Sequence, residues 1–356
     1  PSAAVRKVLE RTLGVPIFQE QVMQLSIIAA GFSGGEADQL RRSMAAWKRR
    51  GGLEPFRKRL VDGMRDRGYR REFAEQIYRQ IQGFGEYGFP ESHAASFALL
   101  VYVSAWLKCH EPAIFVCALL NSQPMGFYAP AQLIQSAQRH GVEVRPVDVN
   151  NSHWDCTLEQ SFRQQPALRL GLRMAKGLSQ RGAEQLVAVR GKQPFADVQQ
   201  LAERAALNAS DYAALAAADA LRSITGNRHQ SSWQVAGIEK PTALFPTLHI
   251  AEGEPLLRVP DIASSVLDDY SSVGYSLRQH PMALIRGSLQ SGCSSAVELR
   301  QLADGARAYA VGLVITRQRP GSSANVTFVT LEDETGFINV VVWEQLAEKQ
   351  RSTLLN

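Results

Sequence analysis

The sequence predicts an α+β protein that is mostly helical, with its clearest β-strands near the C-terminus. Short segments with apolar residues at helical spacing, separated by glycines, fill the first third of the chain. Residues 307–343 instead alternate between apolar and polar side chains, which is typical of strands. At 356 residues the chain is long enough for two or three domains, each with its own hydrophobic core.

The first 125 residues are expected to be helical. Helices are predicted at residues 5–13, 20–30, 35–50, 56–68 and 72–82. Gly83, Gly85 and Gly88 then form a joint. The apolar run that follows, within residues 87–121, is too long for a strand and predicts a buried helix. Pro112 is expected to break this helix, because proline lacks an amide hydrogen and clashes with the preceding turn.

The remainder of the chain alternates between helical and irregular segments. We expect a helix at 131–139, a short strand within 142–149, helices across 167–233, and a helical segment at 266–289 with a turn near 279–281. Residues 236–259 contain proline and glycine, lack periodicity and predict a linker.

The charge is modest overall but strongly basic in one stretch. The net charge is +5 and the pI is about 9.1. Residues 41–71 contain twelve lysines and arginines against three acids. Such a local excess favours a polyanion as partner, the alternative being a solvated helix face.

The cysteines and the hydropathy exclude several classes of protein. The four cysteines are scattered without CxxC spacing, so neither a zinc site nor a disulfide framework is predicted, and a reducing cytoplasm is expected. No signal peptide or membrane-spanning segment is predicted, since the apolar run at 97–107 is too short. We therefore expect no membrane partner. The chain begins with Pro1 and ends without a helix cap or a tail, which predicts a fragment of a larger protein.

Several blocks of sequence resemble one enzyme family. They are GVPIFQEQVMQ (14–24), GEADQLRRSMAAWKRR (35–50), PESHAASFA (90–98) and NNSHWDCTLE (150–159). Together they resemble the fingers domain of the bacterial C-family DNA polymerases, the group that includes the DNA polymerase III alpha subunit. The sequence PESHAASFA, with ALLNSQPMGFY (118–128) after it, resembles sequences of the error-prone branch of this family, the damage-induced translesion polymerases that act in the mutasome.

The resemblance divides the chain into four regions. They are a fingers domain (1–125), a tandem helix-hairpin-helix DNA-binding region (126–235), a linker with a helical connector (236–304), and a truncated OB-fold (305–356). The last assignment rests on about three predicted strands that resemble the opening strands of an OB-fold, a five-stranded barrel that handles single-stranded nucleic acid.

The resemblance also implies a site for the incoming nucleotide triphosphate. Arg41 and Arg42 would face the triphosphate, with Lys48 adding charge, because guanidinium groups match phosphate oxygens. Ser92 and His93 lie at a helix start, which favours phosphate binding. Alternatively, Ser92 is an N-cap and His93 a cap or a core group.

A contact with the template and primer is implied for Gln19 and Gln21 by the resemblance alone. Their neighbours Phe18, Val22 and Met23 are predicted to pack in the core. Core packing and helix capping are the alternative explanation of this block.

Residues 176–190 resemble a helix-hairpin-helix motif, in which a glycine turn presents backbone N–H groups to a DNA phosphate. The predicted phosphate-binding residues are Lys176, Gly177, Leu178, Ser179 and Arg181, with Ser179 in the place of the second glycine. A second hairpin is predicted at 215–233, with its turn at 216–218. Because that turn has lost both glycines, it is expected to support the first hairpin rather than to bind DNA.

The expected partners are primer-template DNA, single-stranded template DNA and the accessory proteins of the mutasome. The replicative relatives carry a clamp-binding peptide soon after the hairpins. Residues 241–245 keep its apolar Leu244 and Phe245 but have Pro241 where glutamine is expected. Recruitment to the sliding clamp is therefore predicted to be indirect.

No catalytic residue is predicted in the chain itself. Transfer of a nucleotide by two Mg²⁺ ions needs clustered carboxylates, and in this family they lie in the palm domain. Asp148 and Asp155 are isolated, and residues 332–334 read as surface acids in a hairpin turn. We expect no metal or cofactor in this fragment, Mg²⁺ in the parent polymerase, and no primer extension by the fragment alone. The alternatives are the same region of a replicative alpha subunit, or a non-catalytic helical DNA-binding protein.

Overall fold

The fold is mostly helical with two small sheets, which confirms the predicted α+β class. A computed structural model describes residues 2–45, 54–84, 89–126, 128–238, 255, 257–320 and 325–355. The chain divides into two compact units, residues 1–107 and 108–356. Each unit has its own hydrophobic core and is described by itself.

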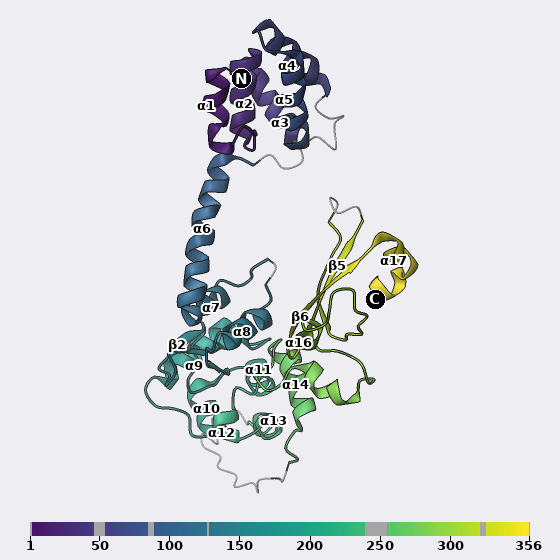
Figure 1. The fold of residues 1–356 in the computed structure, drawn as a ribbon. Helices are drawn as coiled ribbons and strands as arrows, with labels where there is room; N and C mark the ends of the chain where they lie inside the picture. The colour runs from purple at the N-terminus through teal and green to yellow at the C-terminus, as the bar shows by residue number, and fades with distance from the viewer. Residues whose placement is uncertain are drawn as a thin grey trace. The chain divides into compact units, whose positions relative to one another are not determined.

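The first unit is built from helices, shown in purple and blue in Figure 1. Its elements are α1 (Ala3–Leu9), the 3₁₀ turn η1 (Glu10–Thr12), α2 (Gln19–Ala30), α3 (Gly34–Ala45), α4 (Glu54–Asp66), α5 (Arg71–Phe84) and most of α6 (Glu91–His110). The five helices predicted from residue 5 to residue 82 are confirmed within a few residues, although the end of the third lies outside the described residues.

The core of the first unit draws on each of its first five helices. Val5 comes from α1, Leu25 from α2, Leu40 from α3, Met64 from α4 and Ile81 from α5, and all are buried. They recur on one side of each helix because apolar residues three or four positions apart share a face. The predicted core residue Val22 is buried, and Met23 packs against this core.

Helix α6 differs from the prediction for the apolar run. None of the residues of α6 is buried, so the prediction of a buried helix is wrong for this part of the run. The later part of the run, residues 112–121, does form a buried helix, with Val116 and Leu120 in the core. The side chain of Leu99 is 66% exposed and that of Tyr102 is 72% exposed. Pro112 ends the helix as predicted, since it is the first residue of α7 (Pro112–Asn121).

Among the described residues, no single helix is long and apolar enough to span a membrane. Helices α6 and α7 reach the length and apolar content of a membrane span only when they are taken together, and the two form a sharply bent pair.

The second unit begins with α7 and a small sheet. Its first elements after α7 are α8 (Pro130–Arg139), β1 (Val144–Arg145), β2 (Thr157–Glu159) and β3 (Ala167–Arg169). The central strand β3 pairs with β1 in parallel and with β2 in antiparallel. The predicted helix at 131–139 and the strand within 142–149 are confirmed. The prediction of helix from residue 167 is wrong for β3, where Leu168 is fully buried between its two neighbouring strands.

A set of short helices follows this sheet. They are η3 (Leu172–Met174), α9 (Gln180–Arg190), α10 (Val198–Ala205), α11 (Ala209–Ala217), α12 (Arg222–Thr225) and α13 (Arg228–Ala236). Four of these helices have an N-cap residue whose side chain accepts a hydrogen bond from a backbone N–H of the first turn. These N-cap residues are Ser179, Asp197, Asn208 and Asn227. Most of the predicted linker, residues 239–254 and 256, lies outside the described residues.

The last part of the second unit contains a connector and the C-terminal sheet. The connector comprises α14 (Ile262–Ser272), α15 (Pro281–Ile285), η4 (Arg286–Ser288) and α16 (Ala296–Leu299). The sheet is followed by α17 (Glu344–Lys349) and α18 (Arg351–Leu355), and its strands are β4 (Leu313–Gln318), β5 (Thr327–Asp333) and β6 (Gly336–Val342).

The C-terminal sheet is antiparallel, with the order β4-β5-β6. Figure 1 labels two of its strands, β5 and β6. A bulge in β4 lies between Val314 and Thr316. The strands predicted between residues 307 and 343 are confirmed. The described residues here form a three-stranded sheet, so the OB-fold barrel stays a prediction.

Two acids of the predicted surface turn are in fact buried. Glu332 and Asp333 lie at the end of β5, and Glu332 accepts a hydrogen bond from Arg139. Asp333 accepts bonds from the backbone N–H of Ala296 and from Arg286. The prediction of surface acids is therefore wrong for these two residues, because Glu332 binds α8 and Asp333 binds the connector.

Candidate functional site

The structure brings the start of α2 and the start of α6 together. Phe18 and Phe89 form a short parallel bridge, and the backbone N–H of Gln19 donates to the carbonyl of Phe89 at 3.0 Å. The backbone N–H of Glu91 donates to the carboxylate of Glu20 at 2.9 Å. Two sequence blocks that the resemblance singled out, 14–24 and 90–98, therefore form one local site.

Gln21 is a structural residue in this arrangement. Its side chain is buried, and its Oε1 accepts hydrogen bonds from the backbone N–H groups of Ile17 and Phe18. Its Nε2 donates to the carbonyl of Val8 and to the hydroxyl of Thr12. Because both ends of the amide are used, a template contact by Gln21 would break bonds that fix the start of α2. Gln19 is half-buried beside it.

Arg41 and Arg42 share one carboxylate. Asp38, one turn earlier on α3, lies 2.8 Å from Arg41 Nη2 and 2.8 Å from Arg42 Nε. The hydrogen bond from Arg41, together with the charges of both guanidinium groups, holds the pKa of Asp38 below its ordinary value. The side chain of Arg42 is 74% exposed and that of Arg41 36%. The third predicted cation, Lys48, lies outside the described residues.

Ser92 and His93 lie in the first turn of α6 and are exposed. Ser92 is the second residue of the helix, so the alternative in which it acts as N-cap is wrong. The imidazole of His93 lies 4.4 Å from the ring of Phe97, centroid to centroid. Within the described residues no hydrogen bond or ion pair joins Ser92 or His93 to Arg41 or Arg42.

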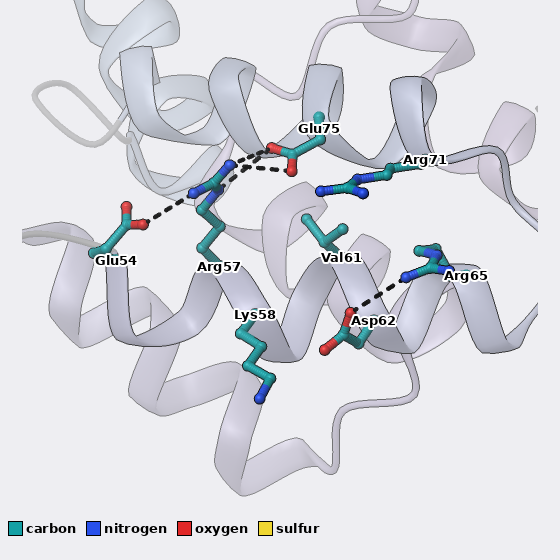
Figure 2. A pocket seen from close by; sticks show the side chains of 8 residues that line it. All are labelled: Glu54, Arg57, Lys58, Val61, Asp62, Arg65, Arg71 and Glu75. Carbon is teal, nitrogen blue, oxygen red and sulfur yellow. Dashed lines mark hydrogen bonds and ion pairs between the residues drawn. The ribbon is translucent and has the colours of Figure 1, made fainter.

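The basic stretch forms a shallow polar hollow between α4 and α5. Its volume is about 260 Å³, and Figure 2 shows the residues that line it. The guanidinium of Arg57 lies between Glu54 and Glu75 and is bonded to both. Arg65 pairs with Asp62 at 3.9 Å. Two of the twelve cations of the basic stretch, Arg57 and Arg65, are therefore paired with acids within the hollow itself.

The predicted DNA hairpin is present in the second unit. Gly177 adopts a φ of 86°, a conformation that favours glycine, and α9 begins three residues later. Ser179 has an ordinary φ of −75°, and its hydroxyl accepts a bond from the N–H of Gly182. Serine can therefore replace the second glycine, because this position requires an N-cap rather than a left-handed residue. Leu178 is buried and anchors the turn in the core.

Most of the hydrogen-bond donors of this turn are already bonded to other parts of the chain. The backbone N–H of Ser179 and its hydroxyl both donate to the carboxylate of Asp211, at 2.8 and 2.9 Å. The backbone N–H of Lys176 donates to the carbonyl of Ser272, and its ammonium donates to the carbonyls of Tyr270 and Ser271. Lys176 thus binds the C-terminal end of α14, where carbonyl groups attract a cation. Arg181 is exposed on the first turn of α9.

Asp211 is a site residue that sequence reasoning missed. It is buried, and it also accepts a bond from the side chain of Asn208 at 2.8 Å. A Cβ on Gly182 would lie 2.3 Å from its Oδ2, so this carboxylate requires a glycine at 182. The pairing joins residues 32 positions apart, and no local sequence pattern marks it.

The connector is joined to the hairpin region by a buried ion network, which sequence reasoning also missed. Asp269 on α14 lies 2.5 Å from Arg228 and 2.6 Å from Arg278. Arg278 also lies 2.5 Å from Asp219, beyond the end of α11. With the contacts of Lys176, this network fixes α14 against the helices of the predicted DNA-binding region.

The second hairpin turn lies later than predicted. Ala216 and Ala217 are part of α11, so the prediction of a turn at 216–218 is wrong for these two residues. The chain reverses at Asp219, which has a φ of 55°, and at Gly226, which has a φ of 85°.

Within the described ranges, no group of three or more histidine, cysteine, aspartate or glutamate side chains is placed to hold a metal ion. Asp148 caps its own turn by accepting bonds from Asn150 and Asn151, and Asp155 pairs with Arg173 at 2.8 Å. The described residues therefore do not fit the two Mg²⁺ ions expected in a polymerase.

Comparisons with known proteins match these two regions. Residues 1–68 match the family model of the bacterial DNA polymerase III alpha subunit finger domain, and residues 141–231 match a helix-hairpin-helix motif. The chain is 61% identical over its whole length to an error-prone DNA polymerase of Alkalilimnicola ehrlichii, 58% identical to that of Methylococcus capsulatus and 53% identical to that of Pseudomonas aeruginosa.

These three matches cover 100% of this chain and 35%, 36% and 35% of the relatives, so the chain spans about a third of the length of the curated relatives. With the finger and hairpin regions both matched, the whole chain is similar to about one third of an error-prone DNA polymerase.

Proposed function

We propose that the chain is the part of an error-prone polymerase that binds the incoming nucleotide and the primer-template DNA during damage-induced translesion synthesis. The observation that carries this proposal is the 61% identity over the whole chain to an error-prone DNA polymerase. The relatives compared above bear that name, which favours the error-prone branch over a replicative alpha subunit. The finger match favours a polymerase over a non-catalytic DNA-binding protein.

Arg42 is the residue best placed to bind a triphosphate. Most of its side chain is exposed, and its partner Asp38 is shared with Arg41. A triphosphate carries more negative charge than one carboxylate and accepts bidentate hydrogen bonds, so it can replace Asp38 as partner of the exposed guanidinium. Arg41 then keeps Asp38 and orients the end of α3. Lys48 and His93 stay in the proposed site as additional cations, with Ser92 as a hydroxyl beside them.

DNA binding is assigned to the start of α9. Three N–H groups of the hairpin turn, those of Lys176, Leu178 and Ser179, have partners inside the protein. A phosphate would therefore meet the N–H groups of Gly177, Gln180 and Arg181, together with the side chain of Arg181. In this proposal Lys176 has a positioning role, because its ammonium binds α14.

The chemical step is proposed to need carboxylates from outside the described residues. Two Mg²⁺ ions would be held by a palm domain in the complete polymerase, and no step of the transfer is assigned to residues of this chain. We accordingly predict that the chain alone binds DNA but does not extend a primer. Mutasome accessory proteins and an indirect link to the sliding clamp stay proposals, and residues 241–245 lie outside the described residues.

The test compares two cations of the hairpin. Binding of a fluorescent primer-template is measured by anisotropy at several salt concentrations, for the unchanged chain and for R181A and K176A. We expect R181A to weaken DNA binding. The slope of the logarithm of the binding constant against the logarithm of the salt concentration should fall in magnitude by about one, because one phosphate contact is lost. K176A is expected to keep that slope and to lower thermal stability. An unchanged affinity in R181A, or the loss of a phosphate contact in K176A, would contradict the assignment.

The nucleotide site is tested separately. Arg42→Ala is expected to weaken binding of a deoxynucleoside triphosphate to the chain with bound DNA, and Arg6→Ala serves as a control on α1. Equal affinities of the two variants would show that the triphosphate lies elsewhere.

A further inference from the structure

Helix α6 is apolar around its whole circumference. Four consecutive residues, 99–102, are turned by about 100° from one to the next, so together they cover all sides of the helix. All four are more than half exposed, namely Leu99, Leu100, Val101 and Tyr102. Residues 92–107 contain no aspartate, glutamate, lysine or arginine. A helix of this composition is normally buried on every side.

Both ends of α6 are held by polar contacts. At the N-terminal end, Glu91 pairs with Arg11 at 2.7 Å and its backbone N–H donates to Glu20. At the C-terminal end, the carbonyl of His110 accepts a bond from Gln165 at 3.0 Å. The contacts therefore fix the ends of a helix whose apolar middle is uncovered, which is the arrangement of an interface rather than of a frayed segment.

We propose that the middle of α6, residues 97–106, is the surface on which the remaining two thirds of the error-prone polymerase pack. The relatives are nearly three times as long as this chain, and the identity of 61% extends over α6. A part of that size can surround a helix, whereas a second copy joined face to face would leave half of the circumference exposed. The inference rests on the proposed membership of the error-prone polymerases and not on nucleotide or DNA binding.

The partner surface must be an apolar groove. Exposed uncharged rings and branched side chains, such as Trp106, Tyr102 and Val101, fit a hydrophobic wall with an acceptor for the Tyr102 hydroxyl. A charged or strongly polar partner would leave its groups unpaired against this helix.

Thiol labelling tests this proposal. In a background of Cys109→Ser and Cys293→Ser, Tyr102→Cys is compared with Phe162→Cys, which replaces another exposed ring in the second unit. Each variant is made in the chain itself and in the complete polymerase of Alkalilimnicola ehrlichii with the matching region replaced by this chain. We expect Tyr102→Cys to react with a maleimide about tenfold more slowly in the complete polymerase, and Phe162→Cys to be unaffected.

Ser104→Cys serves as a second reporter if Tyr102→Cys impairs folding. Equal rates for the α6 thiols in both proteins would overturn the proposal. So would protection already present in the dilute chain, which would show that the chain covers its own helix. Protection that appears with rising concentration would identify a second copy as the occupant, and protection by phosphatidylcholine vesicles a lipid surface. Because the readout is thiol access, a failure of DNA or nucleotide binding leaves this test unaffected.

Discussion

The contribution of Asp269 to stability can be estimated from its surroundings. Its side chain is 6% exposed and is the common partner of Arg228 and Arg278. Asp269→Ala removes the closest counter-charge of Arg228, which is itself buried. Removal of one partner from a buried ion pair typically costs about 3–5 kcal/mol, because the other charge stays buried without compensation.

Two remaining acids place the expected cost at the lower end of this range. Arg278 keeps Asp219 at 2.5 Å, and Arg228 keeps Asp268 at 3.6 Å. We therefore expect a loss of about 3 kcal/mol in the unfolding free energy of the second unit. For a unit of this size, about 2–4 °C per kcal/mol gives a Tm lower by about 6–12 °C. Because α14 would also loosen from the hairpin region, faster amide exchange is expected across 262–288.

Asp268 is a matched control on the same helix. It also faces Arg228, but its side chain is 45% exposed, so Asp268→Ala should cost less than about 1 kcal/mol. Scanning calorimetry measures both variants, and hydrogen exchange reports on α14. Equal Tm shifts in the two variants, or unchanged exchange across 262–288 in Asp269→Ala, would refute the reasoning from burial.

Three further predictions follow from local geometry. Gly182→Ala should lower stability by about 1–3 kcal/mol, because its Cβ would overlap Asp211; Gly287→Ala, with open space around it, should be near neutral by calorimetry. Burial raises the pKa of Asp333, but hydrogen bonds from Thr335, Ala296 and Gly336 outweigh it and hold the pKa below its ordinary value. Its stabilising effect is therefore complete above an unfolded pKa of about 3.9 and is lost as the pH falls toward the folded value. In urea unfolding at acid pH, the unfolding free energy of Asp333→Asn should fall less steeply with decreasing pH than that of the unchanged chain. An equally steep fall would contradict this. Finally, burial raises the pKa of Cys117 to about 11 and also raises that of Cys156, so a thiol reagent should label Cys109 and leave these two unmodified until the chain unfolds, as mass spectrometry can check.

Elements that depend on local signals could be predicted from the sequence. The first five helices follow from apolar spacing and glycine stops, and the break at Pro112 follows from proline geometry. The hairpin at Gly177 was also predictable, because its left-handed turn requires glycine. The strands of the C-terminal sheet follow from their alternation. In each case the residues that determine the element lie within about one or two turns of it.

Elements that depend on distant partners could not be predicted. The conformation of short strands such as β3 depends on neighbours eight or more residues away, and apolar content alone does not separate such strands from a helix. Lys176 carries the charge expected of a phosphate ligand, yet its ammonium binds carbonyls 94 and 95 residues later. Similarly, Glu332 and Asp333 resemble turn acids until their partners Arg139 and Arg286 are known. Which charges are free and which are paired is a property of the tertiary structure.

The exposed α6 shows that a wrong prediction of burial can itself be informative. Burial of an apolar helix away from water is favourable whichever element covers it, whether that element belongs to this chain or to another. When the helix forms as predicted but its middle is uncovered, the composition points to a surface outside the chain. The same reasoning does not apply to Leu13, whose side chain is 94% exposed, because a single exposed apolar residue is common on protein surfaces. It applies to α6 because exposed apolar side chains continue over about three turns, and contiguous surfaces of this kind are characteristic of interfaces.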